Sequence, residues 1–315
     1  MYCPRLDHFV RFNSNGTVGR CGHMTRAPEF SSLEEIESSA WLHNTKLSFD
    51  KGIWPKECQR CKQTEQINGT SIRLNAIDFD QQQSKADYLT VGGVLDNVCN
   101  SACLTCDAGL STKIGSLYSN TYPIVDNADR FWKLPLDRVV HLDINGGEPS
   151  ASKNYRYLLR HIPNNVKSVR INTNCSAVIT EIEELLTRGI DITVTVSLDG
   201  IEEIHDLVRW PIKWDKFYKN LMAYKNMSGL KLNTWTTVSA LNIGNFNSII
   251  AFVNQHNIDH SYALLHDPDV LNVKHVNSWT SNHQEVIPGK VAVDKNNQAD
   301  IDAFMVTQKH LRGMI

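Results

Sequence analysis

Six segments with strand character alternate with helical segments between residues 88 and 265, and this repeat limits the folds open to the chain. The segments are rich in β-branched residues, which favour strands. They are YLTVGGVL (88–95), RVVHLDI (138–144), SVRIN (168–172), DITVTVSLDG (191–200), KLNTWTTVSAL (231–241) and SYALL (261–265). Repeated strand–helix alternation predicts a parallel sheet, either open or closed into a barrel.

The clearest helical pattern between these strands runs from Thr180 to Arg188. Thr180 and Glu183 have the spacing of a capping box, in which each side chain bonds the other residue's backbone. An apolar stripe follows, and Gly189 supplies the stop signal expected just after a helix.

The predicted strands each have one polar face. In residues 191–199 the apolar face holds Ile192, Val194, Val196 and Leu198, and the polar face holds Thr193, Thr195, Ser197 and Asp199. A parallel sheet that is covered on both faces reads instead as continuous apolar runs. We therefore expect a closed or nearly closed barrel whose polar face lines a ligand-holding cavity. An antiparallel sheet with one solvated face is the alternative.

Composition narrows the setting in which this barrel works. The chain has 315 residues, a length that fits two domains or one large domain with an appendage, and its 41% apolar residues suffice for a sizeable core. The net charge is -2, and no cluster of Lys and Arg predicts a nucleic-acid or anionic-membrane surface. Neither a signal peptide nor an apolar run of membrane-spanning length is visible, so we expect a cytoplasmic protein with reduced thiols.

Three cysteines, Cys99, Cys103 and Cys106, occur within the eight residues CNSACLTC directly after the first predicted strand. A disulfide fits a cytosolic protein poorly. Structural zinc needs a fourth protein ligand, and none lies close behind Cys106. An iron–sulfur cluster is also held by thiolates, and with three of them one iron would stay open to a ligand that is not protein.

Four further cysteines form a second set near the N-terminus: Cys3, Cys21, Cys58 and Cys61. The first two bracket FVRFNSNGTVGRC, which predicts a hairpin, and the last two lie in the C-x2-C of ECQRC. Between them, Ser32 and Glu35 have the spacing of a capping box. Four thiolates suit either a zinc ion or a fully ligated iron–sulfur cluster, and both remain open on these grounds.

The motifs CNSACLTC after the first strand, GGEP (146–149) after the second and SLDG (197–200) at the end of the fourth resemble those of radical S-adenosylmethionine enzymes. The segment from SLDG through IHDLVR (204–209) is most similar to the branch that carries SPASM or twitch auxiliary-cluster domains. The resemblance spans roughly residues 85 to 265 and implies a partial (β/α)6 TIM-like barrel. The N-terminal pattern C…NGTVGRC…WPKECQRC…NGTSIR resembles a twitch or SPASM-like domain placed ahead of the barrel. We therefore expect a small cysteine-rich iron–sulfur domain at residues 1–84 and a barrel domain at residues 85–315.

The family's chemistry explains a set of three cysteines. In such enzymes they hold a [4Fe–4S] cluster whose fourth iron binds S-adenosylmethionine. Reductive cleavage of that cofactor gives a 5'-deoxyadenosyl radical, which abstracts a hydrogen atom from the substrate. The resemblance implies a second, auxiliary [4Fe–4S] cluster on the four N-terminal cysteines. It also implies an external flavodoxin- or ferredoxin-like electron donor.

The resemblance assigns cofactor-binding roles to several polar or small residues. Gly146 and Gly147 would let the backbone approach the methionine moiety, and Glu148 would lie near its ammonium group. The remaining residues are Ser197 and Asp199 for the ribose, Arg209 for the carboxylate and Asn174 as a further polar group at the rim.

Two departures from the family pattern involve residues close to the expected cofactor. Thr105 stands where a bulky or aromatic residue often packs on the adenine. A TNG-like stretch reads TNC here, so Cys175 would stand at the catalytic rim. It is either a hydrogen-atom donor to a substrate radical or an ordinary buried thiol.

Two classes of function remain. One is a radical enzyme acting on a peptide, a protein or a small metabolite, and an RNA substrate is a weaker form of it because no basic stripe is visible. The other is a non-catalytic module whose cysteines hold structural zinc. The polar stretch QQQSKAD (81–87) predicts an interdomain linker, and residues 299–315 predict a closing helix with no sign of what it packs on.

Overall fold

The computed structural model describes residues 1–84, 86–118, 124–276 and 298–314. These residues form an α/β fold around one eight-stranded sheet with the order β2-β1-β3-β4-β5-β6-β7-β8. The strands are β1 (Phe9–Phe12), β2 (Val18–Gly19), β3 (Leu89–Val94), β4 (Val139–Asn145), β5 (Ser168–Thr173), β6 (Asp191–Ser197), β7 (Lys231–Val238) and β8 (Asp259–Leu264). All six predicted strands are confirmed as β3 to β8.

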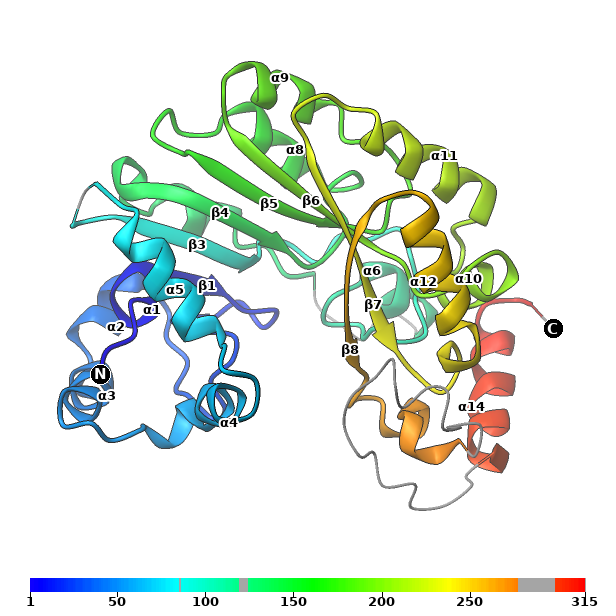
Figure 1. Cartoon of the computed structure of the whole chain (residues 1–315), viewed down its shortest axis with the longest axis horizontal. Helices are drawn as coiled ribbons and strands as arrows, with labels where there is room; N and C mark the ends of the chain where they lie inside the picture. Colours follow the sequence, from blue (N-terminus) through cyan, green and yellow to red (C-terminus); the bar gives the residue numbers. More distant parts are fainter. Residues whose placement is uncertain (85, 119–123, 277–297, 315) are drawn as a thin grey trace.

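Strands β3 to β8 are neighbours in chain order, and every adjacent pair among them is parallel. This pairing confirms the partial TIM-like barrel and rules out the antiparallel alternative. Figure 1 shows the sheet as an arch with helices on its outer side. The helices after β3 are α6 (Thr112–Leu117), α7 (Ala128–Trp132), α8 (Lys153–Arg160), α9 (Glu181–Thr187), α10 (Glu203–Val208), α11 (Trp214–Lys225), α12 (Phe246–Gln255) and α14 (Gln298–Leu311). Short 3-10 turns lie at η2 (Leu136–Arg138), η3 (Ile243–Asn245), η4 (Asp269–Leu271) and η5 (Val273–His275).

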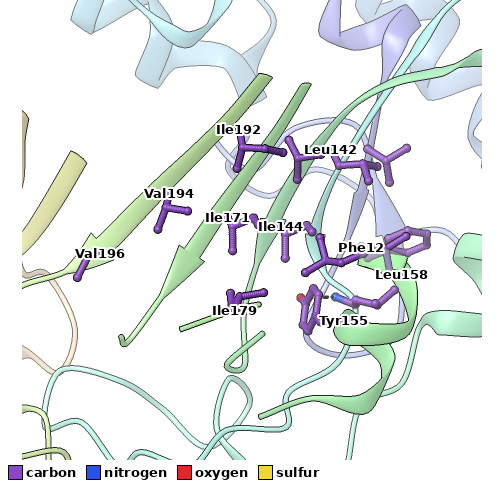
Figure 2. Close-up of a cluster of buried hydrophobic side chains, with 14 of the residues drawn as sticks. Phe12, Leu142, Ile144, Tyr155, Leu158, Ile171, Ile179, Ile192, Val194 and Val196 are labelled. Atoms are coloured by element: carbon purple, nitrogen blue, oxygen red, sulfur yellow. Dashed lines mark hydrogen bonds between the residues drawn. The ribbon is translucent and has the colours of Figure 1, made fainter. Parts of the chain in front are cut away.

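The core lies between the apolar face of the sheet and these outer helices. Figure 2 shows the cluster, in which β6 contributes Ile192, Val194 and Val196, each 0% exposed. Tyr155 and Leu158 of α8 pack against the same cluster. Full burial of such a side chain contributes about 1.5–3 kcal/mol to folding, so the alternation in these strands fixes which face the helices cover.

The polar face of the sheet is the inner face of the arch. On β4 the polar residues His141, Asp143 and Asn145 are half-buried, while Leu142 and Ile144 are buried. On β6 Ile192, Val194 and Val196 are buried and Thr193 and Ser197 are half-buried, although Thr195 is buried as well. Within the described residues the end strands β2 and β8 are not paired with each other, so the barrel is open there.

The N-terminal residues form the predicted hairpin, with Arg11 opposite Gly19 and Phe12 opposite Val18. Strand β1 also pairs in parallel with β3, so the hairpin continues the main sheet. The helices of this region are α1 (Arg5–His8), α2 (Leu33–Ser38), α3 (Ala40–Asp50), the turn η1 (Lys56–Cys58), α4 (Gln59–Asn68) and α5 (Ile72–Gln81). The division into residues 1–84 and 85–315 stays a prediction.

The capping box expected at Thr180 and Glu183 is wrong. Thr180 already has helical backbone angles, with φ -66° and ψ -23°, and its side chain caps nothing. A capping side chain needs an extended backbone at that position, which Thr180 lacks. The box at Ser32 is half confirmed, because Ser32 Oγ accepts a bond from Glu35 N while the Glu35 carboxylate accepts from Ser31 N instead.

The chain leaves α5 at Gln81, and Lys85 of the predicted linker lies outside the described residues. The predicted closing helix is α14, of which Ile315 is not described. Helix α14 contacts the turn η4, which follows β8. In the described part of the chain no helix combines the length and apolar character that crossing a bilayer requires.

Candidate functional site

The loop with the three cysteines leaves the carboxyl end of β3 and is held along its backbone by neighbouring segments. Ala102 N donates to Trp210 O at 2.8 Å, and Leu104 N donates to Val208 O at 2.9 Å. Ser111 Oγ donates to Ser101 O at 2.6 Å from the other side. The loop is therefore fixed between the end of α10 and the start of α6.

The three thiols of this loop are poorly exposed to water. Cys103 is buried, and Cys99 and Cys106 are half-buried. Burial raises the pKa of all three thiols, that of Cys103 to about 11. Thiolates are the form that binds metal, so a positively charged metal centre would be needed to deprotonate these groups at neutral pH.

Gly146 and Gly147 turn the chain sharply after β4 and bring the next loop against the cysteine loop. Both have positive φ angles, +77° and +57°. A Cβ on Gly147 would lie 2.7 Å from Val98 O, and one on Gly146 would lie 2.6 Å from a methyl group of Val94. Only glycine fits both positions without a shift of the backbone.

Glu148 joins this glycine turn to the loop after β5. Its side chain is 0% exposed. One carboxylate oxygen accepts bonds from Ser150 N, Ser150 Oγ and Thr173 Oγ1, and the other accepts from Asn174 N at 2.6 Å. Glu148 therefore fixes two rim loops relative to each other.

Asn174 continues this network to the cysteines. Its Nδ2 donates to Asn100 Oδ1 at 2.9 Å and to Ser101 Oγ at 2.7 Å, and it lies 3.9 Å from Cys99 Sγ. Asn100 in turn donates to Ser176 Oγ at 2.9 Å. The structure thus brings Glu148, Asn174 and the cysteine loop together at the carboxyl ends of β3, β4 and β5.

Asp199 and Arg209 form a buried ion pair, with Arg209 Nη1 2.9 Å from Asp199 Oδ2. The other carboxylate oxygen accepts from Thr237 N at 2.8 Å. Burial opposes the charge on Arg209, but the neighbouring Cys103 and Asp199 outweigh it and raise the pKa of the guanidinium. Arg209 Nε is buried without a hydrogen-bond partner. Ser197 is half-buried on the same strand end.

Cys175 is placed away from the polar face. It is 0% exposed, and its thiol lies 3.8 Å from the carbonyl oxygen of Phe217 on the outer helix α11. Its backbone has a positive φ of +60°, and its carbonyl accepts a bond from Asn220. In this position the thiol is part of the packing between the β5 loop and α11.

Arg312 is a residue that sequence reasoning did not connect with the cysteine loop. It follows α14, yet it donates from Nη2 to Ala102 O at 2.8 Å, and its Nη1 also bonds Gln308 O at 3.1 Å. Gln308 Nε2 donates to Tyr118 Oη at 3.0 Å. Because 210 residues separate Arg312 from Ala102, no local pattern could have indicated this contact.

The four N-terminal cysteines converge although they come from different elements. All four line one cavity, with Phe49 and Trp54 among its apolar walls. Cys58 and Cys61 are buried, and Cys3 and Cys21 are half-buried. Burial raises the pKa of Cys3 to about 12.

Among the described residues, no group of three or more His, Cys, Asp or Glu side chains is arranged to hold a metal ion.

No protein-family model and no curated protein sequence matches this chain. Solved structures match it weakly. Native anSMEcpe with bound AdoMet is 19% identical with a TM-score of 0.43, over 57% of this chain and 52% of that one. Streptococcus suis SuiB bound to S-adenosylmethionine is 15% identical with a TM-score of 0.41, over 98% and 70%. Streptococcus suis SuiB bound to precursor peptide SuiA has 15% identity and a TM-score of 0.44, over 82% and 62%.

The chain thus spans about half the length of the anSMEcpe chain that it matches. These identities and TM-scores are too low to assign the protein to a family.

Proposed function

We propose that the protein is a radical S-adenosylmethionine enzyme that carries a second, auxiliary iron–sulfur centre. One observation carries the proposal. Three thiols with the spacing C-x3-C-x2-C occupy a single loop at the carboxyl end of the first barrel strand, against the turn at Gly146 and Gly147. In a parallel α/β barrel this edge of the sheet is where active sites lie.

The side chains around this loop fit the carboxylate of a cluster-bound cofactor and the thiolates that would hold the cluster. The orphaned Nε of Arg209 belongs to a guanidinium whose charge interacts with Cys103, and a buried donor of this kind needs an acceptor. Asn174 Nδ2 approaches Cys99 Sγ at 3.9 Å, in reach of a weak bond to a thiolate. When bound, a reduced [4Fe–4S] cluster supplies the electron that cleaves S-adenosylmethionine, and the resulting radical takes a hydrogen atom from the substrate.

The protein's own residues hold the parts of this site in place. Cys99, Cys103 and Cys106 would hold the cluster. The turn at Gly146 and Gly147 would admit the methionine moiety, and Ser197 would offer its hydroxyl to the ribose. These assignments follow from the motifs in which the residues stand.

Glu148 and Asp199 need a narrower role than their motifs imply. Both carboxylates already accept bonds from neighbouring loops, Glu148 on both oxygens and Asp199 from Thr237 N and Arg209. We propose that they act first by positioning: Glu148 fixes the loop of Asn174, and Asp199 orients Arg209. Any contact with the cofactor would use their remaining lone pairs.

The N-terminal cavity would hold the auxiliary [4Fe–4S] cluster on Cys3, Cys21, Cys58 and Cys61. With four thiols available, this centre has no need of S-adenosylmethionine as a ligand. We propose that it transfers electrons or positions the substrate, which would be a peptide, a protein or a small metabolite. A cytoplasmic protein of this type would draw its electrons from a flavodoxin- or ferredoxin-like donor.

Metal content and spectroscopy test the proposal. Anaerobic reconstitution should give about eight irons per chain, and S-adenosylmethionine should change the electron paramagnetic resonance signal of one reduced cluster. A variant with Cys99, Cys103 and Cys106 all changed to Ala should keep about half of the iron and lose the response to S-adenosylmethionine. Zinc alone in the reconstituted protein, without charge-transfer absorption, would instead support a structural zinc module.

A further inference from the structure

An open cavity lies between the N-terminal helices and the polar face of the sheet. Helices α1 and α5 and strands β1, β3, β4 and β5 contribute to its wall, and Figure 1 shows α5 and α1 beside β1 and β3. Its strand residues Thr90, His141 and Arg170 lie in the amino-terminal halves of their strands. The cavity is therefore separate from the cysteine loop, which follows the carboxyl ends.

The charges in this cavity do not neutralise one another. Arg5 and Arg170 contribute two cations, and Asp143 contributes one carboxylate. Among the described residues, none of these three side chains forms an ion pair. Burial lowers the pKa of His141 to about 4, so this ring is neutral at pH 7. His8 is already engaged with Tyr88 O and Asp80.

Arg5 is held in place but keeps unused donors. Its guanidinium carbon lies 3.5 Å from the centroid of the Phe9 ring, which restricts its movement. Its Nε is buried and has no hydrogen-bond partner. A buried donor without an acceptor is uncommon in native proteins, and a planar anion is the partner that the fork of a guanidinium fits best.

Aromatic rings form a further part of the wall. Phe79 lies 6.0 Å from Tyr88 and 5.7 Å from His141, measured between ring centroids. Tyr88 stacks on His8 at 4.1 Å and is fixed by a bond from its hydroxyl to Asp80 at 2.8 Å. The cavity thus combines rigid apolar walls with a few placed polar groups, as small-molecule and side-chain sites do.

We propose that this cavity binds a carboxylate, held by Arg5 and Arg170, on a ligand whose neighbouring N–H or O–H donates to Asp143. One net positive charge matches one carboxylate. A phosphate would bring about two negative charges next to the Asp143 carboxylate and is disfavoured by like-charge repulsion. Resting on the proposed function, we assign the carboxylate to the enzyme's substrate.

The position of the cavity suits an anchor for a substrate. Asp143 in the cavity lies two residues before Asn145 at the rim, a distance of about 7 Å along β4. Half-buried polar groups, Asn172 on β5 among them, continue along the same face. Arg5 and Ile72 line both this cavity and the four-cysteine cavity. A ligand held by its carboxylate would lie beside the auxiliary centre and reach the rim within a few atoms of chain.

Equilibrium binding to the anaerobically reconstituted protein tests this assignment. The first probe is hippurate, a small aromatic carboxylate with an adjacent N–H, and its control is the uncharged amide. The second probe is a blocked tripeptide whose only charge is a glutamate carboxylate, with its glutamine counterpart as control. Inorganic phosphate is the third. Cleavage of S-adenosylmethionine without substrate is measured in parallel, so that failure of the proposed function is seen separately.

We expect saturable binding of at least one carboxylate probe, weakened at least about tenfold by Arg170→Gln and by Arg5→Gln. The exposed Lys167 lies outside the cavity, so Lys167→Gln removes an equal charge nearby and should leave binding unchanged. Binding of the tripeptide but not of hippurate would assign the site to a peptide side chain. Binding of hippurate but not of the tripeptide would assign it to a free small acid. The carboxylate assignment would be overturned if the uncharged amides bound as tightly as the carboxylates, or if phosphate bound more tightly than either carboxylate probe. It would also be overturned if Lys167→Gln weakened binding as much as the two arginine variants do.

Discussion

Arg312 donates two hydrogen bonds to the carbonyl oxygen of Ala102, at 2.8 and 3.3 Å, and so joins the end of the chain to the cysteine loop. Ala102 stands directly before Cys103, and its own N–H is bonded to Trp210 O. The loop is thus held between α10 and the residues that follow α14. This relationship makes Arg312 a positioning residue for the three thiols.

Replacing Arg312 by Ala should weaken iron binding at the triad. Loss of the guanidinium leaves the buried Ala102 carbonyl with one fewer partner, which costs about 1–3 kcal/mol. We expect the variant to lose more triad iron than wild type during anaerobic gel filtration. Arg312→Lys should restore part of the iron binding. The exposed His310 lies on α14, just before Arg312, and His310→Ala should behave as wild type. Iron retention equal to wild type in Arg312→Ala would show that the contact does not position the loop.

Glu148→Gln should destabilise the protein although it keeps the size of the side chain. Both carboxylate oxygens accept bonds from N–H or O–H donors, so an amide would point one NH2 group at a donor. We expect the free energy of unfolding to fall by about 2–3 kcal/mol in denaturant titrations. The exposed Glu183→Gln should change it by less than about 0.5 kcal/mol. A similar small effect in both variants would contradict the positioning role of Glu148.

His205 should make the protein less stable in mild acid. Its side chain is 0% exposed, and both ring nitrogens are buried without partners. Burial, and then the charge of Arg209, lowers its pKa to about 3. Because the folded pKa lies below the unfolded value near 6.5, the unfolded chain binds the extra proton first as the pH falls. Stability is therefore complete above pH 6.5 and falls by up to about 1.4 kcal/mol per pH unit below it.

The variant His205→Phe tests this dependence. A phenyl ring keeps the packing on Phe217, whose centroid lies 4.2 Å away, and removes the titrating group. Unfolding titrations at pH 7, 6 and 5 should show a smaller loss of stability in the variant than in wild type. The same slope in both proteins would mean that other groups cause the acid sensitivity.

Changing Cys58 and Cys61 together to Ala should separate the two centres. These thiols line the N-terminal cavity and do not belong to the cysteine loop, so the triad should keep its iron and its response to S-adenosylmethionine. Substrate turnover should fall. Because metal binding contributes to folding, the variant's folded fraction is checked by circular dichroism first. A folded variant that makes product at the wild-type rate would leave the auxiliary centre with a structural role only.

The strands could be predicted from sequence because their signals are local. Alternation in residues 191–198 placed Val194 and Val196 on the covered face, and both are buried. The motif residues Asn174 and Glu148 were expected at one edge of the sheet, and they lie there together. These successes follow from the two-residue period of a strand and from the common edge of parallel strands.

The capping box at Thr180 is wrong because spacing alone does not set the backbone angles, and Thr180 is already helical. For Cys175 the sequence leaves a hydrogen-atom donor and a buried thiol both open, and the structure places its thiol against Phe217. The hairpin at the N-terminus is predicted, but its parallel pairing with β3 is not. The last two features depend on residues far away in the chain, so no local pattern encodes them.

The central claim is that the triad, and the triad alone, supports cleavage of S-adenosylmethionine. The most direct measurement is the formation of 5'-deoxyadenosine by anaerobically reconstituted protein with dithionite, followed by chromatography. Wild-type protein should form 5'-deoxyadenosine without substrate, even if the rate is low. Cys103→Ala, in which the buried thiol of the loop is lost, should form none, while Cys175→Ala should still form it. The account would be contradicted if Cys103→Ala still formed 5'-deoxyadenosine. It would also be contradicted if wild-type protein that holds both clusters formed none.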